Sequence, residues 1–302
     1  MSAARALLGE LIDDAGLFPP ARLSMADALT AHERAQAGET YWMLGRFIVA
    51  ASQLDELRAH LDDSPDPLPT SVVLDGEPSD GLEAAAAARG DRISVEAVEV
   101  RAALIGGASA DALARFAARC GRVGLPATTL CYIELAVDDD PALALANLRD
   151  AGSAGRALCA KIRCGGVTAE ARPDPGRLAA FIGAAKEHAV PFKATAGLHH
   201  PIAHDNVSAG FPMHGFLNVI GGAVLLHAGA IDGAGLEAML RDEEPRHFHL
   251  DEQRFEWSGA AADAAAIGAA RAAFVHSYGS CSFEEPIDDL CALGMLGETR
   301  SV

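Results

Sequence analysis

The sequence lacks any apolar run that approaches the ~20 residues needed to span a bilayer. Its first residues also lack the basic segment and apolar core of a secretory signal. Basic residues are scarce, since 24 lysines and arginines stand against 42 aspartates and glutamates, for a net charge of −18. This acidic balance disfavours contact with nucleic-acid phosphates or anionic lipid surfaces. We therefore expect a cytoplasmic protein whose partners include neither nucleic acid nor membrane.

Two further absences concern cysteine pairs and linkers. The six cysteines form no CxxC pair, which argues against a zinc knuckle or a disulfide framework and favours reduced, mostly buried thiols. No polar, proline- and glycine-rich stretch separates two independent apolar regions. The sequence therefore predicts a single domain over residues 1–302.

What the sequence does contain is a repeated alternation of short apolar runs with alanine- and leucine-rich segments of helical period. About eight such units occur in a chain that is 50% hydrophobic. Repeated strand–helix units predict parallel strands, and barrels of this kind need ~250 residues. The expected fold is an α/β, TIM-like (β/α)₈ barrel. Its predicted strands are Leu11–Asp14, Met43–Val49, Ser71–Asp75, Ser94–Arg101, Thr128–Leu135, Ala157–Cys164, Pro191–Ala196 and Phe274–Tyr278. Helix starts are indicated by capping serines at Ser24, Ser52 and Ser109.

One segment exceeds an ordinary connection between units. Residues 199–259 follow the seventh predicted strand and contain two predicted helices, Gly215–His227 and Gly235–Leu240, and a predicted hairpin, Phe248–Trp257. An insertion of this length after a barrel strand is expected to cover the mouth as a lid or to form an oligomer contact. A homo-oligomer is therefore compatible with the sequence.

Charged residues recur at positions that strand alternation directs into the barrel. Outward side chains meet helices and are apolar, so on the sixth and seventh strands Lys161, Arg163, Lys193 and Thr195 are predicted to face inward. The same rule directs Glu99 and Arg101 inward from strand four, and Tyr132 and Glu134 from strand five. Asp14, Arg46 and Asp75 are expected to complete a ring of charges at the carboxyl ends of the strands. Such a ring predicts a pocket for a small anionic metabolite, although a structural ion-pair network is the alternative for any single residue.

The two lysines on successive strands carry a resemblance to a known family. Lys161 precedes the glycine-rich turn RCGG and Lys193 precedes TAGL. Over residues 157–201 this arrangement resembles class I aldolases of the deoxyribose-phosphate aldolase type. The resemblance implies that Lys161 forms a Schiff base with a carbonyl substrate and that Lys193 lowers its pKa, with no cofactor required. Over its whole length the chain resembles uncharacterised bacterial β/α-barrel domain proteins, which imply no particular activity.

A metal-dependent site is the alternative. Asp75, Glu99 and Glu134 on successive strands, with Lys161 on the next, are similar in order to the Mg²⁺ ligands and base of the enolase superfamily. His199, His200 and His204 cluster after strand seven, where they could bind Zn²⁺ together with Glu99 or Glu134.

Groups for substrate binding are also predicted. Arg46, Arg101 and Arg163 offer guanidinium groups for a carboxylate or phosphate, and Thr195 faces the same space. Ser277, Gly279 and Ser280 at the end of the last strand are expected to bind phosphate, as barrels often do at this place.

The leading hypothesis is a carbon–carbon lyase or aldolase with Lys161 as nucleophile. Lys193 tunes it, and Glu99, Glu134, Asp75 or His199 handles protons. The alternatives are a metal-dependent lyase, isomerase or hydrolase, and a protein that binds an anionic metabolite without turnover.

Overall fold

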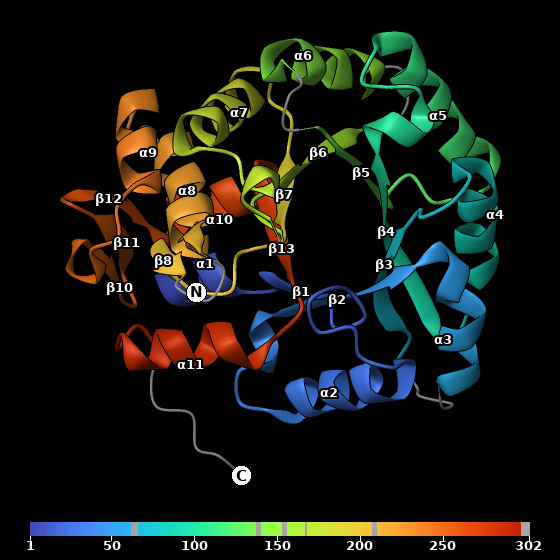
Figure 1. Ribbon diagram of the computed structural model, residues 1–302, viewed down its shortest axis with the longest axis horizontal. Coiled ribbons are helices and arrows are strands. Elements are labelled where there is room, and N and C mark those ends of the chain that lie inside the picture. Colours follow the sequence, from blue (N-terminus) through green and yellow to red (C-terminus); the bar gives the residue numbers. More distant parts are fainter. Residues whose placement is uncertain (62–65, 137–139, 153–155, 167, 207–209, 297–302) are drawn as a thin grey trace.

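Eight parallel strands form a closed barrel in the computed structural model, which describes residues 1–61, 66–136, 140–152, 156–166, 168–206 and 210–296. The strands follow one another around the barrel in the order β1-β13-β7-β6-β5-β4-β3-β2 (Figure 1). This confirms the predicted (β/α)₈ fold, and a strand lies at each of the eight predicted positions. The strands are β1 Ile12–Asp14, β2 Leu44–Ala50, β3 Leu68–Val73, β4 Ile93–Arg101, β5 Leu130–Glu134, β6 Leu158–Arg163, β7 Phe192–Thr195 and β13 Val275–Ser280.

Helices surround the barrel (Figure 1). They are α1 Ala3–Leu8, α2 Met25–Ala37, α3 Leu54–His60, α4 Pro78–Ala88, α5 Ala110–Arg122, α6 Pro141–Gly152, α7 Pro175–Glu187, α10 Ala264–Ala273 and α11 Glu284–Ala292. Ser24 and Ser109 cap α2 and α5 as predicted. The prediction for Ser52 is wrong, because α3 begins at Leu54 and the Ser52 hydroxyl donates to Asp75 Oδ2 at 2.5 Å instead. Within the described residues no helix combines the length and apolar character that crossing a membrane requires.

The main core lies between the strands and the helices. Val98 and Val100 of β4 and Ile133 of β5 are buried in it, whereas Ala97 and Tyr132 belong to a separate small cluster. Alternate residues of each strand thus serve different layers. The inward set includes the charged residues that alternation predicted.

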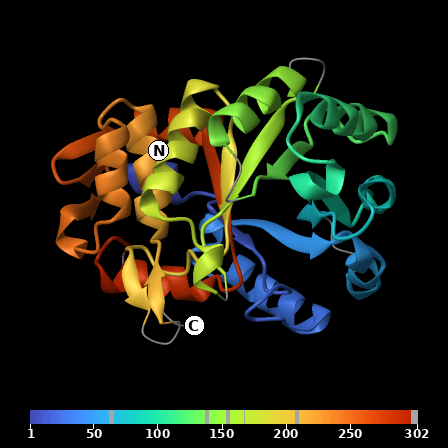
Figure 2. The ribbon, with the colours of Figure 1, turned by 45° about the horizontal axis from the view of Figure 1, so that its top comes forward.

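The predicted insertion between the seventh and eighth barrel strands is present. Its elements are β8 His204–Asn206, β9 Phe211–Met213, the π-helix Leu217–Gly221, α8 Gly222–His227, α9 Gly233–Leu240, β10 Phe248–Leu250, β11 Arg254–Trp257 and β12 Ala260–Asp263. The expected hairpin is therefore a three-stranded sheet, β10-β11-β12. Helices α8 and α9 and this sheet lie on the flank of the barrel in both views (Figures 1 and 2). Residues 222–226 of α8 are buried beside the barrel, so α8 packs as part of the fold, and the role of the insertion as a lid or an oligomer contact stays a prediction.

Candidate active site

Two lysines and three carboxylates form one connected cluster inside the barrel, which we call the lysine–carboxylate network. Lys193 Nζ lies 2.6 Å from Asp13 Oδ2 and 2.7 Å from Glu99 Oε1. Lys161 Nζ lies 2.7 Å from Glu99 Oε2 and 2.8 Å from Glu134 Oε2. Glu99 therefore uses its two oxygens to bridge the two ammonium groups. The network joins five strands, β1, β4, β5, β6 and β7.

Exposure of the inward side chains rises toward the carboxyl ends of the strands. On β6, the side chain of Lys161 is 8% exposed and that of Arg163 is 41% exposed. On β4, Glu99 is buried while Arg101, two residues further on, is exposed. Side-chain exposure on β6 therefore increases from Lys161 toward the carboxyl end, the end at which barrel enzymes hold their substrates.

The deeper half of the network is saturated with hydrogen bonds. The Ser71 hydroxyl donates to Glu99 Oε1 at 2.7 Å, and the Ser277 hydroxyl donates to Asp13 Oδ2 at 2.7 Å. The backbone N–H of Arg46 donates to Asp13 Oδ1 at 2.9 Å. Buried charged groups are stable only when they have such partners. These hydrogen bonds therefore hold Asp13, Glu99 and Lys193 in fixed positions.

The charges of the network shift one another's ionisation. Burial alone would lower the pKa of Lys161, but the negative charges of Glu99 and Glu134 outweigh it and raise that pKa above its usual value. Burial would likewise raise the pKa of Glu99, yet the ammonium groups of Lys161 and Lys193 hold it well below its usual range. The pKa of Glu134 is lowered for the same reason, with Lys161 as the main cation. The expectation of a lowered Lys161 pKa is therefore wrong, because the carboxylates of Glu99 and Glu134 lie within 2.8 Å of the amine and raise its pKa.

Lysine is otherwise almost absent from the chain. The sequence has three lysines, Lys161, Lys186 and Lys193, against 21 arginines. Two of the three lie in this network. The network thus uses lysine at both of its cationic positions, in a chain whose other cations are almost all arginine.

The predicted acid on strand one is corrected by one position. Asp13, not Asp14, enters the barrel, and Asp14 instead contacts His32 of α2, with Oδ2 2.9 Å from Nδ1. The strand reads Leu11-Ile12-Asp13-Asp14, with paired apolar and paired acidic residues, so alternation could not choose between the two aspartates. Ser71 was also missed, since an isolated inward serine gives no signal in the sequence.

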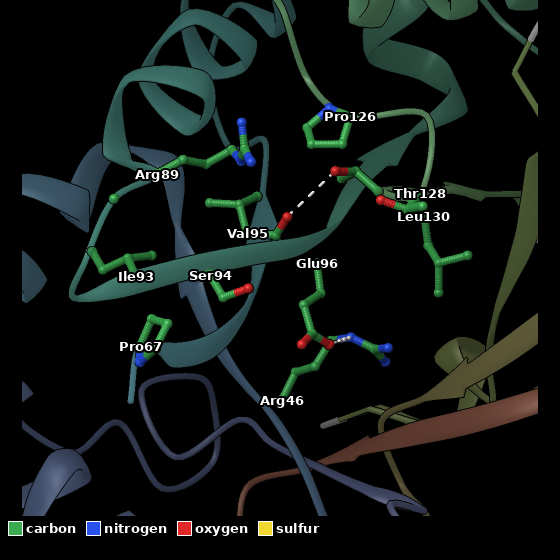
Figure 3. Close-up of a pocket in the computed structure, with 12 residues that line it drawn as sticks. Arg46, Pro67, Arg89, Ile93, Ser94, Val95, Glu96, Pro126, Thr128 and Leu130 are labelled. Atoms are coloured by element: carbon green, nitrogen blue, oxygen red, sulfur yellow. Dashed lines mark hydrogen bonds and ion pairs between the residues drawn. The ribbon is translucent and has the colours of Figure 1, made fainter. Parts of the chain in front are cut away.

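Arg46 lies at the opposite end of the barrel from its predicted place at the mouth. It is the third residue of β2, and its Nε lies 3.0 Å from Glu96 Oε2. The two side chains point toward each other at the edge of a cavity of about 640 Å³ (Figure 3). This cavity is formed at the amino-terminal ends of β4 and β5, so Arg46 supports Asp13 from below and does not reach the mouth.

The other predicted binding residues occupy several depths. Arg163 Nε lies 3.5 Å from Glu134 Oε1, and Arg101 lies exposed at the rim. Thr195 pairs with Gly279 across β7 and β13 at the same end. Ser277 is buried and its hydroxyl donates to Asp13, below the mouth. Ser280 ends β13 at the carboxyl end, where its hydroxyl donates to the Ser282 carbonyl, and phosphate binding there stays a prediction. Asp75 is bound by Ser52 and does not join the network.

The loops after β6 and β7 touch through backbone alone. A Cβ at Gly197 would lie 2.8 Å from Gly165 Cα, and Gly197 has a φ of +74°. We expect Gly197→Ala to lower the free energy of unfolding by about 1–3 kcal/mol, from overpacking and left-handed strain together. Urea denaturation compares it with Gly183→Ala on α7, where a Cβ meets no atom within 4 Å. Equal stabilities of the two variants would contradict this account.

The histidines after β7 lie apart from the network. His199 Nδ1 is 2.9 Å from Glu285 Oε2, and His200 Nδ1 is 2.5 Å from Asp289 Oδ2, both on α11. His204 packs edge-on against His200. Among the described residues, no three histidines, cysteines or carboxylates are grouped so as to hold a metal ion. The predicted ligands Glu99 and Glu134 are instead held by ammonium groups.

The site thus combines a buried, fully paired half with a slightly more exposed half, in which Lys161 Nζ and Glu134 Oε2 lie 2.8 Å apart. A (β/α)₈ barrel is a fold that enzymes commonly use, with the active site at this end. Neither a protein-family model nor a curated protein sequence matches the chain.

Proposed function

We propose that the protein is a lyase of aldolase type that forms or cleaves a carbon–carbon bond in a small anionic carbonyl compound, through a Schiff base on Lys161. One observation carries the proposal: the Lys161 ammonium lies between Glu99 and Glu134 on the outer side of the network, where its side chain is 8% exposed and that of Glu134 is 11% exposed. An iminium ion carries the same positive charge as the ammonium it replaces. The two carboxylates that stabilise protonated Lys161 therefore also stabilise its Schiff base.

Formation of the Schiff base requires Lys161 to give up a proton, because only the neutral amine attacks a carbonyl. Glu134 is the acceptor that this geometry favours, since it is 2.8 Å away on the more exposed side. The amine then bonds to the carbonyl carbon, and Glu134 returns the proton to the resulting hydroxyl, which leaves as water. The raised pKa of Lys161 is thus compatible with the reaction, because the proton moves only between two adjacent groups.

Carbon–carbon cleavage then uses the iminium as the electron acceptor. Glu134, again ionised, takes the proton from the substrate hydroxyl next to the breaking bond. Arg163 and Arg101 at the rim suit the anionic group of the substrate. Lys193 is a positioning residue in this scheme, because it fixes Glu99 beneath Lys161 and is too deeply buried to touch substrate.

Reductive trapping tests the proposal. The full chain is incubated with cyanoborohydride and, in turn, acetaldehyde, glyoxylate, pyruvate and glycolaldehyde phosphate, and the lysine peptides are examined by mass spectrometry. We expect an adduct on Lys161 with at least one probe and its loss in Lys161→Met. Lys186 is the internal control, because it lies on α7 and donates to the Leu226 carbonyl, away from the network.

The competing outcomes are distinct. Equal labelling of Lys161 and Lys186, or labelling of neither, would overturn the Schiff base. If a probe bound without an adduct, the site would be a metabolite-binding site. Stoichiometric Mg²⁺ or Zn²⁺ in protein purified without added metal would instead favour the metal-dependent alternative.

A further inference from the structure

A cysteine, a histidine and a glutamate lie in hydrogen-bonding sequence outside the lysine–carboxylate network. Cys281 Sγ is 3.8 Å from His199 Nε2, within hydrogen-bonding range for sulfur. The other ring nitrogen, Nδ1, is 2.9 Å from Glu285 Oε2. The three residues come from the loop after β7, the loop after β13 and the first turn of α11. Because β7 and β13 are neighbours, these loops meet at the carboxyl end of the barrel.

The order of the three groups fixes the proton positions. An ionised carboxylate only accepts hydrogen bonds, so His199 Nδ1 carries a proton and donates it to Glu285. In the neutral ring, Nε2 is then the acceptor and faces the Cys281 thiol. The bond to Cys281 is the largest cause that raises the pKa of His199, with the charge of Glu285 adding to it against the opposite effect of burial. A base oriented by a carboxylate and aimed at a thiol is the arrangement that activates nucleophilic cysteines.

Both ends of the arrangement are supported by the fold. Ala196 and Gly197 have φ values of +62° and +74°, so the chain turns sharply after β7 just before His199. On α11, the Ser282 hydroxyl accepts from the Glu285 N–H at 3.2 Å and fixes the first turn. Glu285 also lies 3.9 Å from His200 Nε2. The Cys281 and His199 side chains are only partly buried, so a substrate can reach them.

We propose that Cys281, His199 and Glu285 form a second nucleophilic centre that hydrolyses an activated ester or thioester. His199 removes the thiol proton, and the Cys281 sulfur bonds to the acyl carbon. The bond from that carbon to the leaving oxygen or sulfur breaks, and the leaving group takes the proton from His199. Water, with His199 again as base, then releases the carboxylic acid and restores the thiol.

Site-resolved alkylation tests the activated thiol. Intact protein is treated with iodoacetamide between about pH 5.5 and 9, and the modification rates of Cys281 and Cys291 are read by mass spectrometry. Cys291 is the matched control, since it is similarly half-buried and lies ten residues further along, on α11. At about pH 6.5 an ordinary thiol is almost wholly protonated, so we expect Cys281 to react roughly tenfold faster than Cys291. His199→Gln should remove this advantage at about pH 6.5 but not at about pH 9.

Several titratable groups face His199 and contribute to the pH dependence of the Cys281 alkylation rate. These are Cys281 and Glu285, with His200 and Asp289 adjacent. Equal rates for Cys281 and Cys291 in the wild-type protein would overturn the proposal without any variant.

Acylation tests the hydrolytic activity. With p-nitrophenyl acetate we expect a burst of one nitrophenolate per chain, which Cys281→Ser abolishes and Cys291→Ser leaves unchanged. A burst that survives Cys281→Ser, or no acetyl group on Cys281, would contradict the proposed centre. Alkylation and acylation report on Cys281, whereas reductive trapping reports on Lys161. The proposed hydrolytic centre and the proposed Schiff base can therefore fail independently of each other.

Discussion

Replacement of Lys193 by Met is expected to destabilise the protein by about 3–5 kcal/mol, because it leaves two buried carboxylates without their shared cation. Asp13 and Glu99 lie 2.6 and 2.7 Å from the ammonium, and all three residues are at most 1% exposed. The methionine retains most of the volume, so the loss reports on charge more than on packing. Urea or guanidinium denaturation at neutral pH measures it.

The matched control is Lys186→Met. Lys186 is exposed and donates a hydrogen bond to a backbone carbonyl, so its replacement should cost about 1 kcal/mol or less. A second comparison is Lys193→Met combined with Asp13→Asn, in which one unpaired charge is removed. The double variant should be less destabilised than the sum of the single variants. Similar losses for Lys193→Met and Lys186→Met would mean that the network contributes little to folding.

The parts of the site that sequence could predict are those that follow strand alternation. On β6 and β7, the charged residues alternate with apolar ones that are buried in the outer core, and Lys161, Arg163 and Lys193 have the predicted orientation. Alternation fails at irregularities. Thr70 pairs with Val95 but Ser71 pairs with Ala97, so Glu96 is an extra residue in β4. This bulge lets both Glu96 and Glu99 face inward although they are three residues apart.

Depth along a strand was harder to predict than orientation. Inward orientation is shared by Arg46, Ser277 and Glu99. Whether such a side chain reaches the mouth depends on how far along its strand the residue lies. Arg46 lies early in β2 and lines the opposite cavity, and Ser277 lies deep against Asp13. The pairing of His199 with Cys281 and Glu285 joins residues more than 80 positions apart. No local pattern encodes such a contact, because it depends on β7 and β13 being neighbours in the closed barrel.

Removal of the bridging carboxylate, in Glu99→Gln, is expected to cost about 3 kcal/mol or more at neutral pH and to change how stability depends on pH. Glutamine keeps the shape of the Glu99 side chain but removes the negative charge that lies between the ammonium groups of Lys161 and Lys193. The pKa of Glu99 is held below its unfolded value of about 4.3 by Lys161 and Lys193. Its contribution to stability is therefore complete above that value and is lost as the pH falls toward the lower folded pKa.

The wild-type protein should accordingly lose stability steeply between about pH 4 and 2, whereas Glu99→Gln lacks this proton and should show a slope smaller by about 1.4 kcal/mol per pH unit. The two curves converge as the pH falls. Glu96→Gln is the control, because Glu96 pairs with Arg46 at a side-chain exposure of 41% and should cost about 1 kcal/mol or less. Denaturant melts of the three proteins across this range give the slopes directly. Parallel curves for wild type and Glu99→Gln would show that Glu99 is not ionised between its two lysines, and the proton exchange proposed for Lys161 would lose its electrostatic basis.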